Sequence, residues 1–177
     1  SRTVVNRIWN QIFGRGIVST IEDMGTQSEP PSHPALLDWM SVHLMEDQKW
    51  SLKSLIRSIV LSGTYQQNST INENNYQKDP LNIYYARGTK LRLKAEEVRD
   101  QALAVSGLLV PKMGGPAVKP PQPKGFGKHR YGGSWVDSKG EDRYRRAVYT
   151  YIKRTMTYPS FIVFDAGTRE VCLVNRI

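Results

Sequence analysis

The sequence has little sulfur chemistry and no long apolar run. Its 177 residues include one cysteine, Cys172, so an internal disulfide is excluded and the cysteine and histidine cluster of a zinc site is missing. No stretch approaches the roughly 18 apolar residues that a membrane-spanning helix needs. The glycines match neither common nucleotide-binding pattern, and no Gly-x-Ser-x-Gly is present. Neither a nucleotide cradle, a serine hydrolase site nor a cofactor is therefore predicted.

The sequence also contains few acidic residues relative to basic ones. The chain has 16 Asp and Glu against 25 Lys and Arg, a formal net charge of +9. Residues 1–80 carry seven basic and eight acidic side chains, whereas residues 81–177 carry eighteen and eight. The excess positive charge therefore belongs to the second half, which we expect to face an anionic partner.

Apolar residues recur at helical spacing in four segments, which are residues 4–13, 34–44, 52–60 and 91–106. Gly14 and Gly107 supply stop signals, Ser51 is a good N-cap, and Ser32 or His33 is expected to cap the helix that starts at Pro34. In the last segment Ala95, Val98, Ala102 and Val105 are expected to face inward. These helices predict a mainly α fold in which four amphipathic helices form a helical core.

The remaining segments do not have helical patterns. Residues 66–80 are rich in Asn and Gln and predict a long polar connection, and residues 111–133 are too rich in proline and glycine for a helix or central strand. Alternation over residues 147–152 favours a short strand, so the C-terminal part is expected to be short β or irregular structure. We predict one domain over residues 1–177. Because the sequence starts at Ser1 without a methionine, we expect it to be part of a larger multidomain protein.

Several blocks occur in the order that one family shows. They are Val5-Asn-Arg-Ile-Trp9 with Phe13-Gly-Arg-Gly16, Pro31-Ser-His-Pro-Ala-Leu-Leu-Asp-Trp39, Trp50-Ser-Leu-Lys53 with Ser62-Gly-Thr-Tyr65, and Ala95-Glu-Glu-Val-Arg-Asp100 with Val105-Ser-Gly107. Over most of its length the chain resembles the planctomycete-type domain of unknown function family 1553. The resemblance implies an exported bacterial protein, periplasmic or extracellular, with further domains. Some members carry a cytochrome c segment, but Cys-x-x-Cys-His is absent here, so no haem is implied.

His33 and Asp165 are the candidate catalytic residues. His33 precedes Pro34 at a helix start, where an imidazole can act as a base, metal ligand or anion contact, or simply as a locally bonded cap. Asp165 follows four apolar residues and is either an acid of the site or a turn residue. His43 lies on the apolar stripe of its helix and is expected to be a satisfied, core-facing side chain.

The candidate ligand-binding residues are mostly basic: Arg7, His33, Arg99, Lys128, Arg130 and Arg154. Arg7 and its neighbour Asn6 are expected to bond to an adjacent segment, and Arg99 belongs to the row Arg92, Glu96, Arg99 and Asp100, whose spacing is typical of a solvated salt-bridged face. Lys128 and Arg130 lie in the proline and glycine-rich loop, where Lys112, Lys119, Phe126 and Trp135 also occur. This mixture of cations and rings could hold an anion and stack on sugars or bases.

Three functions remain open. The leading hypothesis is a binding or structural module whose basic face takes an anionic polysaccharide or envelope component. The second is a metal-assisted hydrolase in which His33 meets acids such as Asp23, Glu96 or Asp165. The third is nucleic-acid binding, which no recognisable fold supports.

Overall fold

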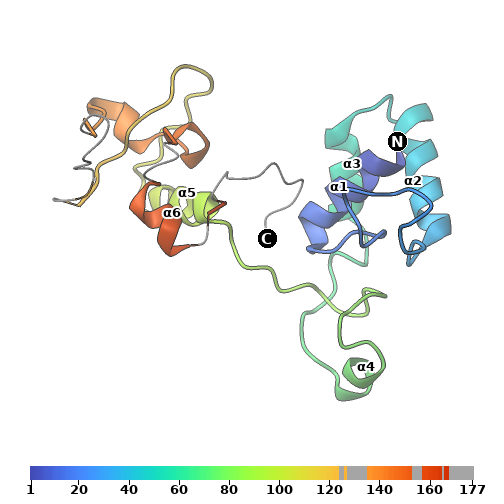
Figure 1. The fold of residues 1–177 in the computed structure, drawn as a ribbon. Coiled ribbons are helices and arrows are strands. Elements are labelled where there is room, and N and C mark those ends of the chain that lie inside the picture. The colour runs from blue at the N-terminus through green and yellow to red at the C-terminus, as the bar shows by residue number, and fades with distance from the viewer. Residues whose placement is uncertain (124–125, 127–134, 153–156, 165, 168–177) are drawn as a thin grey trace. The chain divides into compact units, whose positions relative to one another are not determined.

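The computed structural model describes residues 1–123, 126, 135–152, 157–164 and 166–167. These fall into two compact units, residues 1–91 and residues 92–177, each with its own hydrophobic cluster (Figure 1). The mainly helical prediction is confirmed: the described part contains helices and no strand. The prediction of a single domain over the whole chain stays a prediction, because separate clusters do not measure whether the two units unfold together.

The first unit is built on three helices that lie side by side in Figure 1. They are α1 (Arg2–Phe13), α2 (Pro34–Glu46) and α3 (Leu52–Val60), with α1 against α2 and α2 against α3. Their buried residues follow the predicted spacing and share one core with the loops: Val5, Trp9, Phe13, Ile17, Val18, Leu37, Met40, Leu44, Leu55, Ile59 and Tyr85. Gly14 ends α1 in a left-handed conformation, and the Ser51 hydroxyl accepts the Ser54 N–H at the start of α3. Both predicted signals are confirmed.

A short fourth helix, α4 (Glu73–Lys78), interrupts the predicted polar connection. The Asn72 side chain caps it by accepting the N–H groups of Asn74 and Asn75. None of its residues is buried, so capping rather than packing holds it. This helix lies within the predicted polar connection of residues 66–80, where an N-cap followed by polar residues forms a helical turn without an apolar stripe.

The second unit contains α5 (Ala95–Val105), the 3-10 turns η1 (Gly140–Tyr144) and η2 (Ala147–Tyr149), and α6 (Pro159–Val163). Helix α5 packs against η2 and α6, and Ala95, Ala147 and Phe161 form the cluster between them. The predicted fourth helix therefore exists but contributes to a second core. Its predicted inward face is wrong at Ala102 and Val105, since both are exposed and Val105 is 84% exposed.

The predicted strand at residues 147–152 is not formed. The N–H groups of Tyr149 and Thr150 close a 3-10 turn, and only single-residue bridges follow, Val118 with Thr150 and Val110 with Arg145. The partner segment contains Pro116, Pro120 and Pro121, which lack the N–H donors that a ladder needs. The alternation of residue types over residues 147–152 is therefore not sufficient to form a strand.

Asn6 joins α1 to the loop that follows it. Its side chain, fully buried, donates to the Val18 carbonyl at 3.0 Å and accepts the Val18 N–H at 2.9 Å. Gly16 makes room for this pair, because a Cβ there would lie 2.8 Å from the Asn6 Oδ1 atom and 2.5 Å from the Val18 oxygen. The expected anchoring role of Asn6 is confirmed.

We predict that Asn6→Leu lowers the free energy of unfolding by about 2–4 kcal/mol, because both polar groups of Val18 lose their buried partner. Urea unfolding followed by fluorescence measures it. The control is Arg7→Ala on the exposed side of the same helix, which should change the free energy by less than about 0.5 kcal/mol. Equal effects of the two substitutions would contradict the anchoring role.

Tyr85 is placed in the first core by a tightly bonded loop. The buried Asp79 carboxylate accepts the N–H groups of Ile83 and Tyr84, each at 2.8 Å, and Arg87 donates to the carbonyls of Asp79 and Pro80. The Tyr85 ring then lies against Trp9 and Phe13, and its hydroxyl donates to the Arg15 carbonyl. Burial raises the pKa of Tyr85 above its ordinary value of 10.0.

We expect Tyr85 to ionise later than the exposed tyrosines in an alkaline absorbance titration. Because its folded pKa is raised, the stability it contributes is complete below pH 10.0 and falls as the pH rises through the folded pKa. Tyr85→Phe should remove the last tyrosine ionisation from the absorbance titration and reduce the loss of folding stability at high pH. Tyr84→Phe, at an exposed position, should do neither. An unchanged last ionisation in Tyr85→Phe would show that another group produces it.

Candidate functional site

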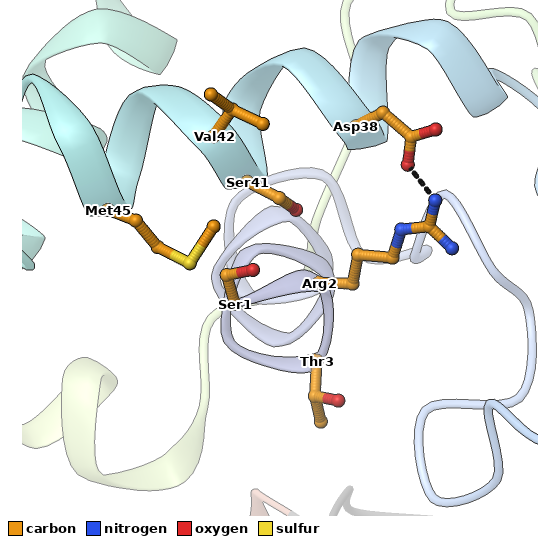
Figure 2. A pocket seen from close by; sticks show the side chains of 7 residues that line it. All are labelled: Ser1, Arg2, Thr3, Asp38, Ser41, Val42 and Met45. Carbon is orange, nitrogen blue, oxygen red and sulfur yellow. Dashed lines mark ion pairs between the residues drawn. The ribbon is translucent and has the colours of Figure 1, made fainter.

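A shallow pocket of about 530 Å³ lies between the start of α1 and one face of α2. Figure 2 shows Arg2 reaching across to Asp38, with which it forms an ion pair, beside Ser41, Val42 and Met45. The Ser41 hydroxyl already donates to the Leu37 carbonyl at 2.7 Å. The pocket thus holds one exposed ion pair and no base beside a hydroxyl, so it lacks the arrangement of a nucleophilic site.

His33 caps α2 by position and belongs to an aromatic cluster. Its Nδ1 atom lies 2.9 Å from the Ser32 hydroxyl, which also approaches the Ile17 carbonyl, and its ring contacts Tyr84 and Tyr85. Within the described residues, no carboxylate contacts His33. The prediction of a His33 site with neighbouring acids gains no support from these contacts, and the described residues include no group of three or more His, Cys, Asp or Glu that could hold a metal ion.

His43 was expected to face the core, but it lies on the partly exposed side of α2. Its ring stacks on Trp39 with centroids 5.0 Å apart, and its Nδ1 atom lies 2.5 Å from the Asp47 carboxylate. The expectation of a core-facing side chain was wrong because the buried face of α2 runs through Leu37, Met40 and Leu44, and His43 lies at the edge of that face.

The predicted ligand-binding residues fall in both units and in segments outside the described residues. Arg7 is exposed and makes no polar contact with another described residue, so its predicted anchoring role was wrong and only Asn6 performs it. Arg99 lies in the other unit. Lys128, Arg130, Arg154 and Asp165 lie outside the described residues.

Arg99 and Asp100 bind backbone instead of forming a solvated face. The Arg99 guanidinium donates to the carbonyls of Arg145 at 2.7 Å and Arg143 at 3.0 Å. The Asp100 carboxylate accepts the Ala147 N–H at 2.6 Å and contacts Arg146 at 3.3 Å. The predicted solvated row was wrong for these two residues, because they fasten residues 143–147 onto α5.

Arg145 is a buried structural residue that the sequence did not single out. It is 1% exposed, and its guanidinium donates to the carbonyls of Lys112, Gly114 and Pro116 while lying 4.0 Å from the Tyr149 ring centroid. Gly114 and Gly115 have positive φ, which lets the loop wrap this cation. A row of arginines on a basic surface looks the same in sequence, so no periodic signal could have identified it.

A cluster of rings around one lysine occupies the proline-rich part of the second unit. We call Lys119, Trp135, Tyr151 and Tyr158 the ring cluster. The Lys119 Nζ atom lies 5.1 Å from the Tyr151 ring centroid, and the Trp135 ring lies 6.3 Å from both Tyr151 and Tyr158, nearly parallel to the latter. Sequence analysis predicted the mixture of cations and rings, including Lys119 and Trp135. It missed Tyr151 and Tyr158, which come from beyond the loop.

The backbone holds this cluster in place. Residues 118 and 119 bond to the chain on both sides: Tyr151 N–H to the Val118 carbonyl at 2.7 Å, and Ser138 N–H to the Lys119 carbonyl at 2.8 Å. The Ser138 hydroxyl in turn accepts the Lys119 N–H at 2.9 Å. Tyr151 is 41% exposed, so an oriented aromatic face and an ammonium are presented together, an arrangement that can bind an anion attached to a flat apolar surface.

The fold and these contacts define a mainly helical protein. Its loops are held by hydrogen bonds from side chains, and its second unit contains the ring cluster. The whole chain, residues 1–177, matches the model of the family described as PSD1: Protein of unknown function (DUF1553). The chain belongs to this family, which confirms the resemblance. No curated protein and no solved structure shows a significant match to it. None of the helices in the described ranges is long and apolar enough to cross a membrane.

We predict that Arg145→Met lowers the free energy of unfolding by about 2–4 kcal/mol, because three carbonyls lose a charged donor. Arg145→Lys should recover only part of this loss, since an ammonium cannot reproduce the fork of a guanidinium. The control Arg146→Met removes an ion pair at a half-exposed neighbour and should cost less than about 1 kcal/mol. Denaturant unfolding compares the three, and equal losses at residues 145 and 146 would contradict a buried clamp.

Proposed function

We propose that this chain is a binding module of an exported bacterial protein, and that its second unit binds an anionic polysaccharide of the cell envelope at the ring cluster. The observation that carries the proposal is the placement of the Lys119 ammonium over Tyr151 beside Trp135. Rings supply an apolar face for sugar C–H groups, and the lysine supplies the charge for an acid group.

The charge distribution supports the same unit. Residues 92–177 carry sixteen basic and eight acidic side chains, against nine and eight in residues 1–91. Arg99 and Arg145 bind carbonyls of the same chain, whereas Lys112 and Lys139 are exposed and Lys119 is partly exposed. This field attracts a polyanion to the unit, and the ring cluster gives the contact its geometry.

The first test is binding of polygalacturonate and dextran sulfate by the whole chain at about 20 and about 200 mM NaCl. We expect salt-sensitive binding that Lys119→Gln weakens about tenfold at low salt, equivalent to about 1.4 kcal/mol. Lys112→Gln removes an exposed lysine without a ring contact and should change the Kd less than about twofold.

Two outcomes would contradict binding to a polysaccharide, and a third would contradict the site. One is the absence of salt-sensitive binding to either polymer at low salt. The other is tighter binding of a single-stranded oligonucleotide than of both polysaccharides, because rings and cations also stack and neutralise nucleic acid. Equal effects of the two lysine substitutions would remove the ring cluster as the site.

A further inference from the structure

The segment Lys119-Pro-Pro-Gln-Pro123 is restricted to extended backbone at most of its torsions. Each proline fixes its own φ, and each residue before a proline is held in the extended region. Such a sequence favours a polyproline II turn, with three residues per turn and a rise of about 3.1 Å per residue. In that conformation Lys119 and Gln122 are one turn apart and share one side, separated by about 9 Å along the axis.

Two rings of the cluster are anchored to this turn. The Trp135 indole N–H donates to the Pro120 carbonyl at 2.9 Å, and the Tyr158 hydroxyl donates to the Pro121 carbonyl at 3.1 Å. A polyproline II turn has no internal hydrogen bonds, so its carbonyls are free to take these donors. The polar atoms of both rings are thereby used, and what the rings offer a ligand is their apolar surface.

Unused hydrogen-bonding groups lie next to these anchors in sequence. Both amide atoms of Gln122 and the hydroxyl of Ser160 are buried and have no partner among the described residues. Gln122 follows the carbonyl that Tyr158 binds, and Ser160 is two residues after Tyr158. Buried polar groups are paired in most proteins, so a set of unpaired ones beside an aromatic surface calls for a specific explanation.

We propose that the ring cluster, whose binding role rests on the proposed function above, takes an acidic pyranose oligosaccharide rather than polyanions in general. Lys119 binds the acid group of one sugar, the rings of Trp135 and Tyr151 take C–H faces, and Gln122 and Ser160 bind hydroxyls. Gln122 and Ser160 are both partly buried residues whose polar atoms are covered in this structure, so the amide and the hydroxyl reach the ligand by a change of side-chain rotamer. The spacing of Lys119 and Gln122 exceeds one pyranose ring, so the ligand is an oligomer.

The experiment compares four polymers: polygalacturonate, dextran sulfate, neutral dextran and inorganic polyphosphate. We expect the two acidic polysaccharides to bind most tightly, and the ratio between them to show whether carboxylate or sulfate is preferred. Gln122→Ala and Ser160→Ala should each weaken binding of the acidic polysaccharides about threefold to tenfold and leave the weaker polyphosphate binding unchanged. Lys119→Gln should weaken binding of all three polyanions. Trigalacturonate should compete with the polymer at a concentration where galacturonate does not.

Failure of the inference is distinguishable from failure of the proposed function. If polyphosphate binds as tightly as the polysaccharides, or if Gln122→Ala and Ser160→Ala bind all polymers as the unsubstituted chain does, the site recognises charge alone and the inference is overturned. If no polyanion binds, the proposed function falls as well. Thermal unfolding is the check on structure: Gln122→Ala removes unpaired groups and should not lower the midpoint, and a lowered midpoint would assign Gln122 a structural role and contradict the inference.

Discussion

Buried backbone groups outside helices need hydrogen-bond partners, and in three loops of the described part side chains supply them. Asn6 bonds both polar groups of Val18, Asp79 accepts two N–H groups of its loop, and Arg145 donates to three carbonyls. A sheet would provide such partners in a repeating ladder, but the described part contains only two isolated bridges. Each irregular segment therefore depends on one or two side chains, and losing one removes the partners of several backbone groups at once.

Because some arginines bond inside the fold, the net charge overstates the positive charge that the surface presents. A formal +9 suggests a cationic surface, yet two of the arginines in the second unit bind carbonyls of the same chain, and one of them is the largest fully buried side chain described. The ring of Tyr149 and three carbonyl dipoles replace a counter-ion for Arg145. Guanidinium suits this role because its planar fork reaches several acceptors together. The other fourteen basic residues of this unit are seven lysines and seven arginines.

Much of the helical structure could be predicted because its signals are local. The spacing around Leu55 and Ile59, the cap at Ser51 and the left-handed stop at Gly14 act within one or two turns, and all three were confirmed. The failures concern tertiary partners. Val105 follows the helical period but finds no neighbour to cover it, whereas Arg145 has no apolar signal and is buried because three carbonyls converge on it. Of the candidate site, Lys119 and Trp135 could be identified from the sequence, but Tyr151 and Tyr158 could not, since their approach depends on bonds to Val118 and Pro121.

The ring cluster follows from the same constraint. Proline in the segment after Val118 removes the donors that a strand would need and leaves carbonyls exposed. Trp135 and Tyr158 supply the missing donors, and in doing so they fix two large rings beside Tyr151 and Lys119. Ring orientation is thus determined by folding rather than by a ligand, which lowers the conformational entropy lost on binding. A segment that cannot form a strand has in this way acquired an aromatic surface whose orientation is set by the fold.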